Sequence, residues 1–308
     1  MDIAIMIEGQ DGLTWTRWQR IARAVEDLGF AGLYRSDHFT NMNPPDKESL
    51  ELWVSLTWLA SHTRRIDFGP LVSPVSFRHP ALLVRMASAV DDLSGGRLTL
   101  GVGAGWQVRE HEHFSFDLLD MAGRFARLEE ALEYITRLLR QDEPVTLHGK
   151  YYQFNEAVLL PRPQRPGGPP ILIGGKGPTR TLPLVARYAD EWNGTFMPPT
   201  TYAERSARLD DLLRAQGRDP KSVRRSLMTG LCFGRTDAEI KHKMTFYQAD
   251  NADELISYGF VVGSDSAVLD QLGAFAEAGV QRIMVQWLEQ DDLNGLEAFA
   301  QAVLPVFQ

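Results

Sequence analysis

Cysteine is almost absent from this 308-residue sequence, which contains a single one, Cys232. One thiol cannot close an intrachain disulfide and cannot supply a cysteine-rich metal site. Cys232 lies in an apolar, strand-like run over residues 226–233, where a cysteine is usually buried and inert. We therefore expect neither a disulfide framework nor cysteine chemistry.

Basic residues are also fewer than acidic ones: the sequence has 32 Lys and Arg residues and 40 Asp and Glu residues, for a net charge of −8. Nucleic acids and anionic membranes bind to basic surfaces, so we expect neither as a partner. No stretch approaches the ~20 apolar residues that cross a bilayer. Residues 1–4 contain an acid where a signal peptide has a base. These features predict a cytoplasmic protein.

Two common site motifs are missing as well. Residues 101–106 (GVGAGW) approach the dinucleotide fingerprint G-x-G-x-x-G, but tryptophan stands in place of the third glycine. His111 and His113 are two residues apart, a spacing that does not bring them to one helix face, and no H-E-x-x-H occurs. The sequence predicts neither a standard nicotinamide-binding domain nor a metal site.

What the chain does contain is a regular alternation of strand and helix signals. Apolar runs bounded by turn residues predict eight strands, and each is followed by apolar residues at helical spacing. The predicted strands are residues 2–7, 31–36, 66–72, 98–102, 171–173, 189–193, 226–233 and 282–287. Eight such units predict an α/β fold, a (β/α)8 TIM barrel that residues 1–308 form as a single domain.

The alternation is interrupted between predicted strands four and five. Residues 107–170 contain a charged loop, an amphipathic helix over about residues 124–140, a hairpin that turns near residues 148–149, and a proline-rich segment. Long connections in compact domains are usually functional. We expect this insertion, with the loops after strands seven and eight, to determine the substrate.

In such barrels the active site lies at the carboxyl ends of the strands. Strand two ends in Asp37 and His38, a candidate proton-transfer histidine beside a carboxylate. The alternative is a histidine that caps the loop. Strand four ends in Gly103, Gly105 and Trp106, where alternate glycines indicate either close approach of a flat ligand or a bent strand.

Strand five runs into a glycine-rich turn formed by Gly174, Gly175, Lys176 and Gly177. Free backbone N–H groups at a helix N-terminus suit a phosphate, and the alternative is an ordinary tight turn.

Aromatic residues also end several strands. The strand-end rule places Trp106, Trp192 and Trp287 around the barrel mouth, with Asn193 beside Trp192, so that Trp192, Asn193 and Trp287 would line a substrate pocket. Aromatic walls, a glycine-rich strand and a phosphate turn together suit a flat, phosphorylated heterocycle.

In their order and spacing, these segments resemble the bacterial-luciferase-like family of flavin- and deazaflavin-dependent oxidoreductases. The matching segments are residues 29–38 (GFAGLYRSDH), 71–74 (LVSP), 79–80 (HP), 94–106 (SGGRLTLGVGAGW), 110–111 (EH), 171–175 (ILIGG) and 186–193 (ARYADEWN). The Ala-Gly-Trp and Glu-His patterns are most similar to the branch that uses coenzyme F420. One departure is Ser115, where relatives often have glycine.

The resemblance implies a TIM barrel with its cofactor at the carboxyl ends of the strands. It implies that Asp37 and His38 lie at the reactive centre and that a non-prolyl cis peptide falls near residues 71–72. The cofactor-binding residues that it implies are Leu71, Val72, Ser73, Gly103, Gly105, Trp106, His111, Gly174, Gly175, Lys176 and Gly177.

The resulting expectation is an F420-dependent oxidoreductase that transfers a hydride to or from a small organic substrate, with His38 as proton donor or acceptor. The alternative is a monooxygenase of the luciferase-like type that uses reduced FMN. A non-catalytic flavin-binding protein and a cofactor-free lyase are weaker alternatives. Members of the family often dimerise, and the sequence neither requires nor excludes a homodimer.

Overall fold

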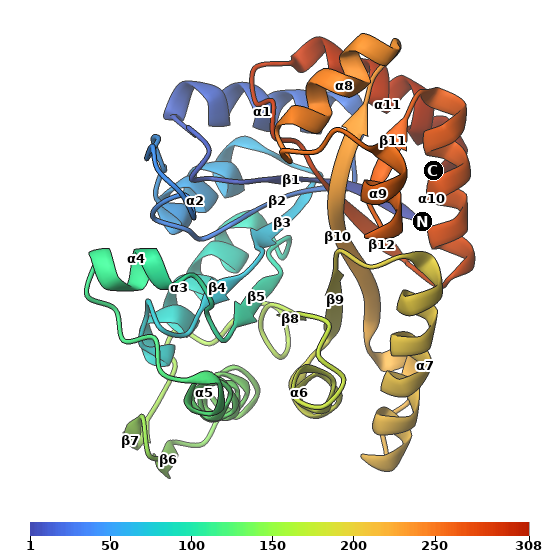
Figure 1. Cartoon of the computed structure of the whole chain (residues 1–308). Helices are drawn as coiled ribbons and strands as arrows, with labels where there is room; N and C mark the ends of the chain where they lie inside the picture. Colours follow the sequence, from blue (N-terminus) through green and yellow to red (C-terminus); the bar gives the residue numbers. More distant parts are fainter. Residues whose placement is uncertain (308) are drawn as a thin grey trace.

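The computed structural model describes residues 1–307 and shows parallel strands surrounded by helices (Figure 1). The strands of the barrel are β1 (Asp2–Ile7), β2 (Gly32–Arg35), β3 (Asp67–Pro70), β4 (Ser73–Pro74), β5 (Leu100–Gly103), β8 (Ile171–Gly174), β9 (Glu191–Thr195), β10 (Arg224–Phe233) and β12 (Arg282–Gln286). They are hydrogen-bonded in the order β3-β2-β1-β12-β10-β9-β8-β5-β4. Only residues 71–72 separate β3 from β4, so the ends of this path come together, and a bridge between Phe68 and Leu98 brings β3 toward β5. The predicted strand over residues 66–72 corresponds to β3, and β4 lies beyond its predicted end. The predicted α/β barrel is confirmed.

The outer helices are α1 (Trp15–Leu28), α2 (Leu52–His62), α3 (Pro80–Ser94), α6 (Thr181–Tyr188), α7 (Pro199–Ala215), α10 (Asp265–Glu277) and α11 (Leu293–Phe307). Local sequence signals set their limits. In α1, the Thr14 side chain accepts a hydrogen bond from the Arg17 N–H, and Gly29 ends the helix at a φ of 97°. Pro80 opens α3, and Gly95 ends it at a φ of 69°.

The predicted insertion between strands four and five contains α4 (Val108–His113), α5 (Met121–Arg140) and an antiparallel hairpin of β6 (Val145–His148) and β7 (Gln153–Ala157). Helix α5 packs against both α3 and α6 (Figure 1). It therefore occupies the place of the fourth barrel helix, and the added parts are α4, its loops and the hairpin. Ser115, in the loop after α4, has a φ of 58°, the left-handed conformation that glycine adopts most readily.

Three elements follow β10: α8 (Asp237–Thr245), α9 (Ala252–Ser257) and the short strand β11 (Val261–Gly263). A helix after this strand was expected and is α8, which begins at its N-cap Thr236, whereas α9 and β11 were not predicted. Strand β11 extends the sheet by pairing with the end of β10. A 3-10 turn, η1 (Pro220–Ser222), precedes β10.

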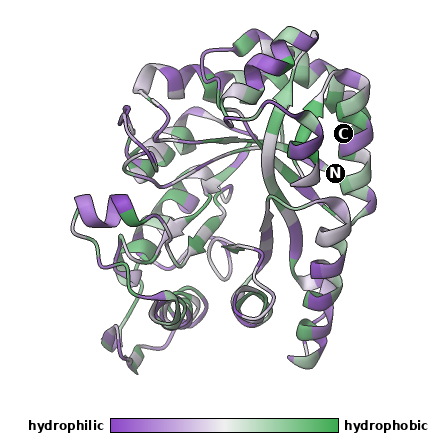
Figure 2. Cartoon of the chain, viewed as in Figure 1, coloured by the Kyte–Doolittle hydropathy of each residue, from purple (hydrophilic) through white to green (hydrophobic). Residues whose placement is uncertain are grey.

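Hydrophobic residues lie along the strands, whereas the short helix α4 is mostly hydrophilic (Figure 2). The large core between strands and helices includes Trp18, Phe68, Tyr202 and Phe299, and a smaller cluster inside the barrel includes Met6, Met228 and Met284. Over residues 1–307, no helix combines the length and apolar character that a membrane span requires.

Candidate active site at the carboxyl ends of the strands

A cavity of about 430 Å³ opens at the carboxyl ends of the barrel strands. Most of its lining comes from strand ends, and α4, α5 and α6 complete the wall. The lining residues are Met6, Glu8, Ser36, His38, Leu71, Val72, Pro74, Gly103, Ala104, Gly105, Trp106, Glu110, Met121, Arg124, Phe125, Leu128, Gly174, Gly175, Thr181, Asn193, Thr195, Phe196 and Met228.

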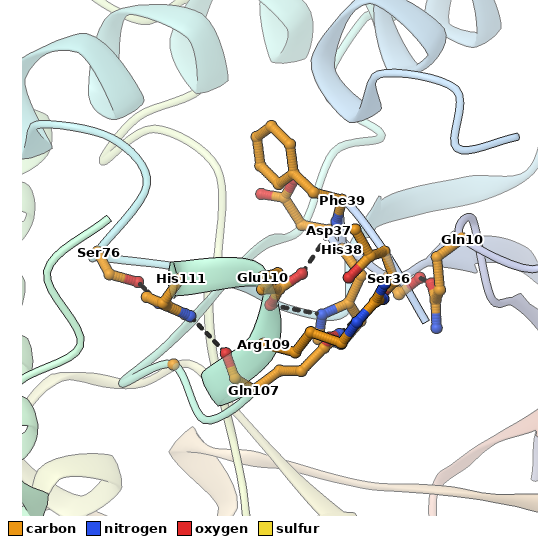
Figure 3. Close-up of polar contacts among 12 residues, drawn as sticks. Gln10, Ser36, Asp37, His38, Phe39, Ser76, Gln107, Arg109, Glu110 and His111 are labelled. Atoms are coloured by element: carbon orange, nitrogen blue, oxygen red, sulfur yellow. Dashed lines mark hydrogen bonds and ion pairs between the residues drawn. The ribbon is translucent and has the colours of Figure 1, made fainter. Parts of the chain in front are cut away.

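His38 is held at the cavity wall by a buried carboxylate from the insertion. Its Nδ1 lies 2.9 Å from Oε1 of Glu110, and the other carboxylate oxygen accepts a hydrogen bond from the Phe39 N–H at 2.9 Å (Figure 3). Glu110 is only 1% exposed. Burial by itself would lower the pKa of His38, but the hydrogen bond and the charge of Glu110 outweigh it, so this pKa is raised. The pair therefore favours an imidazolium whose Nδ1 donates to Glu110.

Glu110 points toward His38 because Gln107 and Arg109, the residues before it, attach α4 to the loop after β2. The Gln107 amide donates to the Thr40 carbonyl at 2.7 Å. Arg109 donates to the Asn41 carbonyl and forms an ion pair with Asp46.

Asp37 lies outside the cavity lining. Its carboxylate accepts hydrogen bonds from the Ser73 hydroxyl, at 2.5 Å, and from Arg78. The Trp53 indole N–H in turn donates to Ser73 at 3.3 Å. Asp37 and Ser73 thus belong to a buried network that links the residue before His38 to the residue after the 71–72 peptide.

The peptide between Leu71 and Val72 is cis, as the resemblance implied, and both residues line the cavity. The glycines of β5 and β8 make room for this segment. A Cβ on Gly101 would lie 2.1 Å from the Pro70 carbonyl oxygen, and one on Gly103 would lie 2.6 Å from Cγ2 of Val72. A Cβ on Gly174 would lie 3.2 Å from Cγ1 of Val72. These glycines therefore allow the neighbouring segment at Pro70 and Val72 to pack closely against β5 and β8.

His111 also lies outside the cavity lining and is 2% exposed. One ring nitrogen lies 2.8 Å from the Ser76 hydroxyl, and the other lies 2.6 Å from the Gln107 carbonyl oxygen (Figure 3). Gly105 has a φ of 80°, and a Cβ there would lie 3.0 Å from the Ser76 hydroxyl oxygen. His111 and Ser76 therefore support the cavity-lining turn at Gly105 from behind.

The glycine-rich turn is divided between two environments. Gly174 and Gly175 line the cavity, together with Thr181 at the start of α6. Lys176 and Gly177 do not: the Lys176 ammonium lies 3.3 Å from the Phe196 carbonyl oxygen, and the Gly177 carbonyl accepts hydrogen bonds from the first N–H groups of α6.

The three strand-end tryptophans have different positions. Trp106 is 55% exposed at the cavity rim, and its ring centroid lies 5.5 Å from that of His38. Trp192 is fully buried and stacks on Tyr202 of α7, while Trp287 is buried against Phe299 of α11.

This arrangement corrects the expectation that Trp192 and Trp287 lie at the barrel mouth. Side chains alternate along a strand, so Trp192 faces the helix layer when Asn193 faces the cavity. Asn193 lines the cavity as expected, and its amide nitrogen donates to Ser226 at 2.9 Å.

Residues 3–255 match the profile of a family described as luciferase-like monooxygenase. The chain belongs to the luciferase-like monooxygenase family. The resemblance predicted from the sequence is thereby confirmed. Among its relatives, an F420-dependent glucose-6-phosphate dehydrogenase of Kineococcus radiotolerans is 25% identical over 92% of this chain and 90% of the relative.

Two further relatives show the range of this family. A 4-hydroxyprotoasukamycin monooxygenase of Streptomyces nodosus is 33% identical over 62% of this chain and 50% of the relative. The structure of a coenzyme F420-dependent tetrahydromethanopterin reductase from Methanopyrus kandleri superposes with a TM-score of 0.82 at 19% identity and covers all of both chains. These relatives are all oxidoreductases, as predicted for this luciferase-like chain.

Several side chains in the cavity of this luciferase-like protein were not predicted from the sequence. Glu8 follows β1, so the same strand-end rule could have found it. Glu110 was noted only as part of a motif, because nothing in the sequence pairs it with His38, 72 residues away. Arg124 and Phe125 are on α5, where only the fold shows which helix face turns to the cavity.

Proposed function

We propose that this protein is an F420-dependent oxidoreductase that transfers a hydride between the coenzyme and a small organic substrate. The observation that carries the proposal is the His38–Glu110 pair in the wall of the cavity. Several relatives that match nine-tenths of the chain are named as F420-dependent dehydrogenases, which supports this coenzyme.

The residues of the cavity fit a flat ring system with a phosphate-bearing tail. Asn193 lines the cavity, and its buried side-chain oxygen has no hydrogen-bond partner among the described residues. It could therefore accept a hydrogen bond from a ring N–H group. The backbone of Leu71 and Val72 and of residues 103–105 would hold the ring, and the backbone at Gly174 and Gly175, with Thr181, would hold a phosphate. When bound there, F420 would supply the hydride acceptor or donor.

The chain itself supplies the proton. Because Nδ1 of His38 is hydrogen-bonded to Glu110, Nε2 is the ring nitrogen that can contact a ligand. A charged imidazole at the wall can give a proton to a polar atom of the substrate that gains a hydride, and a neutral one can take a proton in the reverse direction. Trp106 and the apolar lining would exclude water from this step.

In this proposal the other predicted site residues act from outside the cavity. Asp37 and Ser73 position the loop that carries His38, and His111 positions the turn at Gly105. Lys176 and Gly177 would shape the phosphate turn without lining it. Trp192, through its hydrogen bond to the Gly175 carbonyl at 2.8 Å, would fix the same turn.

The second candidate is an FMN-dependent monooxygenase, which the similarity to the Streptomyces nodosus monooxygenase favours. The His38–Glu110 pair and the apolar lining of the cavity suit either reaction. A homodimer, frequent in the family, stays a prediction that sedimentation would test.

An assay with and without oxygen separates these candidates. Reduced F420 is mixed with the protein and a panel of ketones under nitrogen, and the return of oxidised F420 is followed by absorbance. In parallel, reduced FMN is mixed with the same panel in air. We expect turnover of F420 without oxygen, and a loss of about 10²- to 10⁴-fold in His38→Gln. Turnover only with FMN and oxygen would contradict the proposal.

A further inference from the structure

The part of the cavity that the proposed cofactor contacts leave free is mostly apolar. Met6 of β1, Phe196 after β9 and Met228 of β10 line it. At the opening, Trp106 and Met121 are more than half exposed, at 55% and 52%. Large apolar side chains in a cavity and around its rim indicate an apolar ligand.

One carboxylate, Glu8, lies in this apolar region. Its Oε1 accepts a hydrogen bond from the Gln286 amide at 2.6 Å, and its Oε2 accepts one from the Gln10 amide at 2.9 Å. The Gln290 amide also donates to the Glu8 main-chain carbonyl at 3.0 Å. Both carboxylate partners are neutral amides, so no hydrogen-bonded cation cancels the charge of Glu8. A carboxylate has about four acceptor positions, and two remain for a ligand.

Basic side chains are scarce in this lining. Among the described residues that line the cavity, Arg124 is the one lysine or arginine. It belongs to α5, its Nε donates to the Leu119 carbonyl at 2.8 Å, and its Nη1 lies 3.5 Å from the Gly105 carbonyl oxygen. Arg124 therefore lies toward the turn assigned to the cofactor. The imidazolium of His38 is already paired with Glu110.

From this charge distribution we infer that the substrate is an uncharged, mostly apolar molecule with a hydrogen-bond donor group, from which the Glu8 carboxylate accepts a hydrogen bond. The inference rests on the proposed function, because it assigns the remaining volume to a substrate. An anionic group placed near Glu8 would be repelled by this carboxylate, and the cations that Glu8 attracts through space, His38 and Arg35, already donate hydrogen bonds to other groups of the protein. Sugar phosphates and carboxylates should therefore bind weakly in this part of the cavity.

A pair of ligands with equal shape and different charge tests the inference directly. Cyclohexanecarboxamide offers N–H donors, whereas cyclohexanecarboxylate carries a negative charge. Their dissociation constants are measured by calorimetry at pH 7.5 with the F420-saturated protein. Unit charges about 6 Å apart at a partly shielded site change an equilibrium by roughly tenfold. We expect the carboxamide to bind at least about tenfold more tightly than the carboxylate.

Charge variants identify the group that is responsible. In Glu8→Gln, the ratio of the two dissociation constants is expected to fall toward one. Asp11→Asn removes one charge from a residue that forms an ion pair with Lys47 and lies outside the cavity lining, and it should keep the wild-type ratio. If Glu8→Gln does not fold, the wild-type ratio alone decides.

Equal or tighter binding of the carboxylate by the wild-type protein would overturn the inference, and so would a cavity that binds neither compound. Failure of F420 to bind is a separate outcome that contradicts the proposed function. The two ligands can then still be compared in the protein without coenzyme.

Discussion

The substitution Glu110→Gln should lower the pH at which His38 titrates. Gln keeps an oxygen that can accept the Phe39 N–H, so the loop after β2 retains its hydrogen bond. The change removes the negative charge 2.9 Å from Nδ1 of His38. Burial, which lowers the pKa of His38, is then opposed only by the more distant carboxylates of Glu8 and Asp37.

The size of the effect follows from the type of bond that is lost. A hydrogen bond to a charged group contributes about 1.5 to 3 kcal/mol. At a fixed pH, this loss reduces the ratio of imidazolium to imidazole by roughly ten- to a hundredfold.

Nuclear magnetic resonance of the protein with ¹³C-labelled histidine measures this titration without a substrate. The chain has seven histidines, and the His38 signal is assigned by its disappearance in His38→Gln. Glu112→Gln is the matched control, because Glu112 is an exposed residue of the same short helix. We expect an acid shift of the His38 titration in Glu110→Gln and no shift in the control.

The same pair makes stability depend on pH. The pKa of His38 is higher in the folded protein than in the unfolded chain, so the stabilisation is fully present below the ordinary pKa of about 6.5. It is lost as the pH rises through the raised pKa. The difference in unfolding free energy between wild type and Glu110→Gln should therefore shrink from pH 6 toward pH 9. An unchanged His38 titration together with a constant difference would refute the role assigned to Glu110.

Two other predictions concern packing and the thiol. Gly69→Ala should destabilise the protein by about 1–3 kcal/mol or more, because the added Cβ would lie 2.1 Å from the Thr99 carbonyl oxygen. Gly273→Ala should stabilise the protein by about 0.5–1 kcal/mol, because Gly273 lies within α10 and its added Cβ would have no atom within 4 Å. Denaturant titration measures both, and equal effects would contradict the packing described. Burial raises the pKa of Cys232 to about 12, so Ellman's reagent should label it only after unfolding, and rapid labelling of the native protein would show that the site opens.

The barrel could be predicted because each strand and helix carries local signals. Apolar runs, N-caps such as Thr14 and terminal glycines such as Gly29 act within one element. The places where prediction and structure differ depend on distant contacts. Strand β11 is three residues long, too short for a clear sequence signal, and it is defined by its hydrogen bonds to β10.

The candidate site divides in the same way. The strand-end rule located His38, Trp106 and Asn193 at the cavity, since it needs only the order of strands. It could not decide which of two adjacent residues faces inward, and so it misplaced Trp192. It also could not distinguish a glycine beside a ligand from one beside a neighbouring strand, as at Gly103, where Val72 fills the space.

The proposed ligand of the cavity is the deazaflavin coenzyme F420. Parallel titration of the purified protein with F420 and with FMN, followed by quenching of tryptophan fluorescence, tests this proposal most directly, because Trp106 lies at the cavity rim. Gly103→Leu, which would crowd Val72 and the cavity, should weaken binding. We predict saturable, tighter binding of F420. Tighter binding of FMN, or quenching by F420 that is identical in Gly103→Leu, would contradict the account.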